Sequence, residues 1–253
     1  MNFNELASIV DNAALEAKAV NQLTLQNKFT EQEAYGIQAI SLERRYKRGE
    51  KLIGIKMGFT SEAKMQQMGV HDMIWGRLTD AMLMKVGSTL DLNNFIHPRA
   101  EPELCFLVKK TIDREISFNE IDEYIEAVAP AIEIIDSRYM NFKFSLEDVI
   151  ADNCSSAGLV IGKWQSHKMP LSDLKIELEV NGKAVHTGSS KAILGDPWKA
   201  VLAATRLVHQ YEQVISEGSY LMAGAATPAV FLNEHDEVRA NVENLGAVTF
   251  SVL

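Results

Sequence analysis

The chain has 253 residues, of which 47% are hydrophobic and 23% charged, and its formal net charge is −9. This composition is that of a globular protein with a sizeable core, and the acidic balance argues against nucleic acid as a partner, because its phosphates would be repelled. No apolar run approaches the roughly 18 residues that span a membrane, and the N-terminus lacks the basic and apolar regions of a signal peptide, so we expect a cytoplasmic protein with no membrane partner.

Two helices are predicted near the N-terminus. Apolar residues recur at helical spacing over residues 3–20. Thr30 and Glu33 form a capping-box signature before a second helix, which ends in a basic turn at residues 44–48. We therefore expect an N-terminal helical portion over residues 1–60 and a strand-rich core over residues 61–253, either as separate parts or as one continuous domain.

Strand patterns dominate from residue 51 onward. Leu52–Gly58 reads as a buried strand, and Ser61 as the cap of a short helix that runs through Met68. Asn181-Gly182 predicts a tight hairpin turn, and Asp196-Pro197 opens a helix expected to reach about residue 215. The other strands are expected near residues 79–86, 101–109, 124–135, 157–162, 174–180, 220–223, 229–232, 237–242 and 247–253.

Three glutamates are the candidate metal ligands. Glu101 and Glu103 are two apart at the start of a strand, so both carboxylates project to one face, where a divalent cation would neutralise them. Two solvated glutamates on an edge strand are the alternative. Glu133 lies in an apolar strand pattern, where an unpaired carboxylate is costly. It is either a third ligand or half of a buried salt bridge with Arg138 or Arg99.

Lys56 and Asp80 are candidates of a weaker kind. Lys56 is flanked by apolar residues and glycines, so it needs an anionic partner, either a ligand or a structural carboxylate. Asp80 lies between a turn and a predicted strand, and the alternative to a functional role is that of an ordinary turn residue. The small polar residues at 152–158 and the segment 224–228 are typical of loops.

Taken together, seven segments resemble the hydratase and decarboxylase branch of the fumarylacetoacetate hydrolase superfamily, and they occur in order over most of the chain. The segments are GIKMGFTS (54–61), WGRLTDAM (75–82), PRAEPE (98–103), AIEIIDSR (131–138), ADNCSS (151–156), GDP (195–197) and MAGAAT (222–227).

The resemblance implies an α+β fold with a mixed, rolled, barrel-like sheet and an N-terminal helical portion. It implies Mg²⁺ or Mn²⁺ bound by Glu101, Glu103 and Glu133. It also gives Lys56 and Asp80 catalytic roles and makes the loop residues Ser155 and Thr227 substrate contacts. Cys154 departs from the pattern, because a small residue such as alanine is expected there.

The implied reaction is metal-dependent decarboxylation of 2-oxohex-3-enedioate to 2-hydroxypenta-2,4-dienoate and CO₂, in the meta-cleavage catabolism of aromatic compounds. Arg77 and Lys64 are, on charge alone, candidates to hold the distal carboxylate of this 2-oxo dicarboxylate. Hydration of 2-hydroxypenta-2,4-dienoate is the alternative reaction, and a non-catalytic binding module with exposed glutamates is a second alternative. The resemblance further implies a homo-oligomer and a complex with a 2-hydroxypentadienoate hydratase.

Overall fold

A computed structural model describes residues 2–61, 65–66 and 72–253 of the chain. Its helices are α1 (Phe3–Leu15), α2 (Glu31–Lys47), α4 (Ile121–Tyr124), α5 (Leu146–Ala151) and α6 (Pro197–Gln210). The predicted start of α2 is confirmed, since Thr30 and Glu33 cap each other reciprocally. Asp196 likewise caps α6 by accepting from Trp198 N at 3.1 Å.

Two helices end earlier than the apolar pattern predicts. The predicted first helix extends to residue 20, but α1 ends at Leu15 and Ala17 has a left-handed φ of 49°. The helix predicted to reach about residue 215 ends at Gln210, and Glu212 has a φ of 55°. A residue in the left-handed region cannot continue a right-handed helix.

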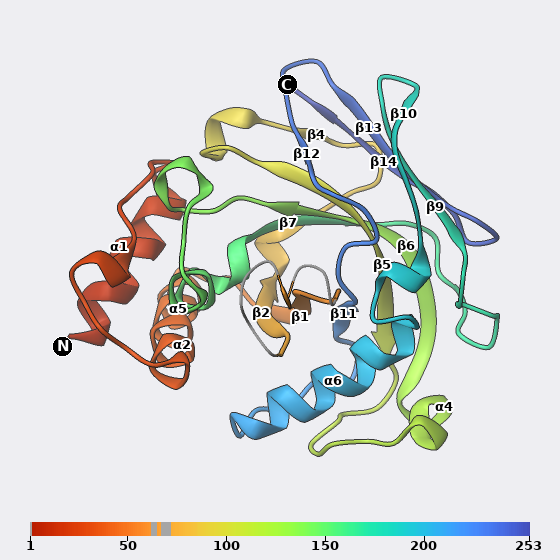
Figure 1. Ribbon diagram of the computed structural model, residues 1–253, viewed down its shortest axis with the longest axis horizontal. Helices are drawn as coiled ribbons and strands as arrows, with labels where there is room; N and C mark the ends of the chain where they lie inside the picture. Colours follow the sequence, from red (N-terminus) through yellow and green to blue (C-terminus); the bar gives the residue numbers. More distant parts are fainter. Residues whose placement is uncertain (1, 62–64, 67–71) are drawn as a thin grey trace.

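Nine strands of the described chain form a curled sheet of mixed direction, in which β1 is parallel to β11 and β3 to β7 (Figure 1). The main order is β2-β1-β11-β5-β6-β7-β3, with β12 paired to β5 and β8 to β6. The strands are β1 (Leu52–Gly58), β2 (Ile74–Thr79), β3 (Leu83–Met84), β5 (Arg99–Val108), β6 (Ile125–Ile135), β7 (Ser156–Ile161), β8 (Gln165–Ser166), β11 (Tyr220–Met222) and β12 (Val230–Phe231).

A smaller sheet packs beside the large one, in the order β10-β9-β13-β14-β4. Its strands are β4 (Thr89–Leu90), β9 (Lys175–Val180), β10 (Lys183–Ser189), β13 (Glu237–Val242) and β14 (Gly246–Val252). The predicted hairpin is confirmed, because Asn181 and Gly182 join β9 to β10 with φ values of 53° and 73°. Positive φ at both turn residues is the requirement that favours Asn-Gly.

The strand predicted at residues 79–86 is wrong in position. The buried strand is β2, which ends at Thr79, and Asp80–Met82 form a 3₁₀ turn before the two-residue β3. Gly76 and Arg77 interrupt the apolar pattern of β2, but pairing with β1 compensates, since Gly76 lies opposite Lys56. The predicted helix at residues 61–68 falls mainly outside the described residues.

The alternation of side chains along β6 decides what faces the site. Ile132 and Ile134 belong to an apolar core shared with Val238 and Phe250 of the smaller sheet. Glu133 therefore points to the opposite face of β6, toward the side of the large sheet where β1 lies.

Because β1 already belongs to this sheet, the sheet begins before residue 60. The division into a helical portion and a core stays a prediction.

In Figure 1, α1 and α2 lie at one end of the molecule, the smaller sheet at the other, and α6 runs along one side. Side chains of α1, α2, β1, β2 and α6 share one large apolar core. None of the described helices combines the length and apolarity that crossing a membrane requires.

Candidate metal centre

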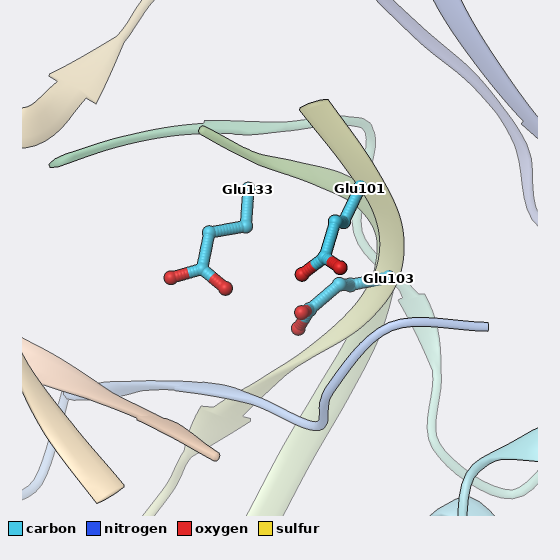
Figure 2. Close-up of side chains that lie close together, drawn as sticks. All are labelled: Glu101, Glu103 and Glu133. Carbon is cyan, nitrogen blue, oxygen red and sulfur yellow. The ribbon is translucent and has the colours of Figure 1, made fainter. Parts of the chain in front are cut away.

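Glu101, Glu103 and Glu133 converge on one point between β5 and β6. Glu101 and Glu103 project from the same face of β5, and Glu133 lies directly opposite Glu101 in the antiparallel register of β6. One carboxylate oxygen of each lies within 4.8 Å of the others, and Figure 2 shows the three side chains pointing toward one another. The predicted convergence of the carboxylates is confirmed.

The three carboxylates are withdrawn from solvent. Glu103 and Glu133 are fully buried and Glu101 is 8% exposed. Glu103 Oε2 accepts from Gly224 N at 2.8 Å, whereas Glu103 Oε1 and Glu133 Oε1 have no hydrogen-bond partner in the described part of the chain. Buried oxygens without donors are rare, and three converging carboxylates are the donor set of a hard divalent cation. These residues fit a bound divalent cation.

The electrostatics agree with this fit. Burial, together with the neighbouring carboxylate of Glu133, raises the pKa of Glu103 well above its ordinary value. Burial raises the pKa of Glu133 as well, against the opposing effect of Lys56 and with a further contribution from Glu101. A cation bound among these groups would favour their charged forms.

Lys56 provides a buried positive charge beside the cluster. It is only 4% exposed, its Nζ lies 3.1 Å from Glu133 Oε2, and it donates to Cys154 O at 3.1 Å. Burial alone would lower the pKa of Lys56, but the charge of Glu133 above all raises it, so the ammonium stays charged. The partner of Glu133 is therefore Lys56, and neither Arg138 nor Arg99.

A left-handed turn brings Cys154 and Ser155 to the site. Asn153, Cys154 and Ser155 have φ values of 50°, 53° and 58°. Asn153 Oδ1 accepts from Arg77 N at 2.7 Å, and its Nδ2 donates to Arg77 O at 2.8 Å, which ties the turn to β2. A Cβ at Gly76 would lie 2.6 Å from Asn153 O, so this contact requires glycine. Ser155 Oγ is buried without a hydrogen-bond partner among the described residues.

These groups open onto a cavity of about 220 Å³. Its polar lining includes Lys56, Glu101 and Ser155. Cys154, which stands where the family pattern predicts a small residue, also lines the cavity. The cavity is otherwise mostly apolar, with side chains from Met57, Phe59, Ile74, Ile135, Phe142, Phe144, Val149 and Ala225. The cavity thus joins an acidic cluster and an ammonium to an apolar chamber, which suits a small organic anion bound through a cation.

Asp80 is not brought to this cavity. Its side chain is exposed, and its Oδ1 accepts from Lys51 N at 2.8 Å. Lys51 precedes Lys56 by five residues along an extended strand, which corresponds to about 17 Å. The structure therefore supports the turn role of Asp80 that the sequence left open.

Three substrate-contact candidates remain. Arg77 Nη1 donates to Gln38 Oε1 at 2.5 Å and its guanidinium stacks 4.6 Å from the Trp75 ring centroid, so it is engaged away from the cavity lining. Thr227 is buried and donates to Pro228 O at 3.1 Å. Lys64 lies outside the described residues.

Two residues at the site were not predicted from the sequence. Asn153 lay within a segment interpreted as a loop, and its signal is that Asn tolerates the left-handed region better than most residues. Gly224 has a φ of 101° and donates its backbone N–H to Glu103. The sequence of the segment 224–228 gave no signal of that backbone donor.

Comparisons with known proteins give a consistent result. The model of the C-terminal domain of fumarylacetoacetate hydrolase matches residues 51–253. A 4-oxalocrotonate decarboxylase of a Pseudomonas species is 47% identical over 99% of this chain and 98% of its own length. A 2-keto-4-pentenoate hydratase of Paraburkholderia xenovorans is 31% identical over 85% of this chain and 81% of its own. The solved 4-oxalocrotonate decarboxylase of Pseudomonas putida G7, complexed with magnesium and adipate, superimposes with a TM-score of 0.94 at 32% identity, covering 99% of this chain and 97% of that one.

Proposed function

The chain belongs to the fumarylacetoacetate hydrolase family, and on that premise we propose that it decarboxylates 2-oxohex-3-enedioate to 2-hydroxypenta-2,4-dienoate and CO₂. The observation that carries the proposal is full-length similarity to a decarboxylase, combined with a buried carboxylate cluster beside an ammonium and an apolar cavity. The enzyme is a carbon–carbon lyase in this proposal.

Glu101, Glu103 and Glu133 would hold the divalent cation, Mg²⁺ or Mn²⁺. The solved Pseudomonas putida G7 decarboxylase contains magnesium in one structure and calcium in another, which supports a hard divalent ion at these oxygens. Such an ion, when bound, supplies a Lewis acid that stabilises negative charge on the 2-oxo acid end of the substrate.

The protein groups complete the site. When the C5–C6 bond breaks, its electron pair shifts through the C3–C4 double bond to the oxygen at C2. Lys56 holds a fixed positive charge at that end of the cavity, where it stabilises the developing negative charge. The hydroxyl of Ser155 is available to donate to a substrate oxygen, and the apolar walls keep water away from the reacting carbons.

Hydration of 2-hydroxypenta-2,4-dienoate is the second candidate, and the 31% identity to a hydratase favours keeping it. The purified protein with Mg²⁺ is given each substrate separately. We expect CO₂ from 2-oxohex-3-enedioate and no hydration of the dienoate; the reverse pattern would replace our assignment. The binding-module alternative predicts exposed glutamates, but Glu103 and Glu133 are fully buried.

Association with further copies of the chain and with a 2-hydroxypentadienoate hydratase is also part of the proposal. It is supported by family resemblance alone. Sedimentation of the protein, with and without such a hydratase, tests both associations.

A further inference from the structure

Arg99 lies in the same row as the candidate metal ligands. It precedes Glu101 by two residues on β5, so the two side chains project from the same face of the strand. Its cross-strand neighbours are Ile135 on β6 and Phe231 on β12. Glu101 and Ile135 both line the cavity, so Arg99 adjoins two lining residues although it does not line the cavity itself.

The guanidinium of Arg99 is held between two aromatic rings. Its central carbon lies 3.9 Å from the ring centroid of Phe142 and 4.2 Å from that of Phe231. Phe142 itself lines the cavity. A guanidinium with both planar faces covered by rings presents its N–H donors only along its edge, which is the geometry that binds a carboxylate through two parallel hydrogen bonds.

No acceptor within the described chain satisfies Arg99. Its Nε is buried without a hydrogen-bond partner among the described residues, and the nearby carboxylate of Glu101 acts on it through its charge without a hydrogen bond from Nε. Other arginines of the chain differ: Arg48 binds Asp11 and Arg138 binds Asp152. Arg99 is partly exposed, and a buried charged donor such as its Nε is costly to leave without an acceptor, so Arg99 is suited to an anion from outside the chain.

We propose that Arg99 binds the distal carboxylate of a six-carbon 2-oxo dicarboxylate whose other end lies at the Glu101, Glu103, Glu133 and Lys56 cluster. The inference rests on the proposed function, and it assigns to Arg99 the role that charge alone suggested for Arg77 or Lys64. Five carbon–carbon bonds of about 1.5 Å separate the terminal carbons of such a diacid. Its carboxylates are therefore about as far apart as residues i and i+2 of a strand, roughly 7 Å.

The test uses two ligands that differ only in the distal group. 2-Oxohexanedioate and 2-oxohexanoate share the 2-oxo acid end, and both lack the C3–C4 double bond, so neither offers the electron path of the substrate. Their binding to the Mg²⁺-loaded protein is measured by titration calorimetry. We expect the wild type to prefer the diacid by about tenfold to a hundredfold, the range for a hydrogen-bonded charge pair.

Arg99→Met should abolish this preference, while the Mg²⁺-loaded variant still binds 2-oxohexanoate. Arg99→Lys keeps the charge but loses the planar fork, so it should retain only part of the preference. Arg114→Met is the matched control, because Arg114 is exposed and paired with Glu120; it should behave as the wild type. Phe231→Ala, at a ring that is 60% exposed, removes half of the aromatic clamp with little risk to folding and should weaken the preference.

An undiminished preference in Arg99→Met, or no preference in the wild type, would overturn the inference. The ratio of the two affinities does not depend on turnover, so failure of the decarboxylation assay is seen separately. In turnover, Arg99→Met should raise KM for 2-oxohex-3-enedioate more than it lowers kcat, because the distal contact exists before the reaction begins.

Discussion

Lys56 Nζ lies 3.1 Å from Glu133 Oε2, on two strands that are not neighbours in the sheet. When ionised, the three glutamates and this ammonium sum to a charge of −2, which one divalent cation neutralises. The ion pair is therefore part of the charge balance of the site.

Replacing Lys56 with Met should abolish turnover and destabilise the metal-free protein by about 3–5 kcal/mol, because a buried carboxylate loses its counter-charge. Steady-state kinetics and urea unfolding in EDTA measure the two effects. Lys191→Met, at an exposed lysine paired with Asp173, is the control and should change neither. Wild-type turnover in Lys56→Met would exclude this lysine from the mechanism.

Metal removal should lower the melting temperature as well as stop the reaction. An ion that binds only the folded state stabilises that state by about 2.7 kcal/mol when the free ion concentration is about a hundred times the Kd. Glu103→Gln should remain folded, lose metal-dependent turnover and lose most of the thermal shift on adding Mg²⁺. The shift is measured by scanning calorimetry with and without EDTA. A full Mg²⁺ shift in the variant would remove Glu103 from the ligand set.

Gly76→Ala tests the contact that fixes the left-handed turn. The new Cβ would lie 2.6 Å from Asn153 O, so the turn or β2 must shift, at an expected cost of about 1–3 kcal/mol and with reduced turnover. Gly36→Ala is the control, because a Cβ there meets nothing within 4 Å and the site is in α2. It should stabilise the protein by up to about 1 kcal/mol. Equal effects of the two substitutions on urea unfolding would contradict the role of Gly76.

Asp11 should contribute a pH-dependent part of the stability. Burial alone would raise the pKa of Asp11, but hydrogen bonds from Arg48 and Arg44 hold it below its ordinary value. The contribution is therefore present above the unfolded pKa of about 4 and is lost as the pH falls through the folded pKa. Asp11→Asn should cost about 1–3 kcal/mol at pH 7.

The free energy of unfolding of wild type and Asp11→Asn is compared from pH 7 to pH 3. The gap between the two proteins should be constant down to about pH 5 and should narrow below pH 4. A gap that widens toward low pH would contradict the assignment.

The sequence alone determined the local features of this protein, namely helix caps, a hairpin turn and the shared face of two glutamates. The caps at Thr30 and Asp196, the Asn181-Gly182 turn and the shared face of Glu101 and Glu103 all follow from the sequence, because each depends on residues within a few positions of one another. The fold class came instead from the resemblance of seven ordered segments to a known family.

Tertiary structure decided which side chains meet. Glu133 joins the cluster only through the register of β6 on β5, and Lys56 meets it only because the sheet curls. Asp80, equally plausible in sequence, instead accepts a hydrogen bond from Lys51, which is about 17 Å from Lys56 along the extended chain. The clamp on Arg99 brings together Phe142 and Phe231, which are 89 positions apart. Strand register and long-range packing set these distances, and no local pattern encodes them.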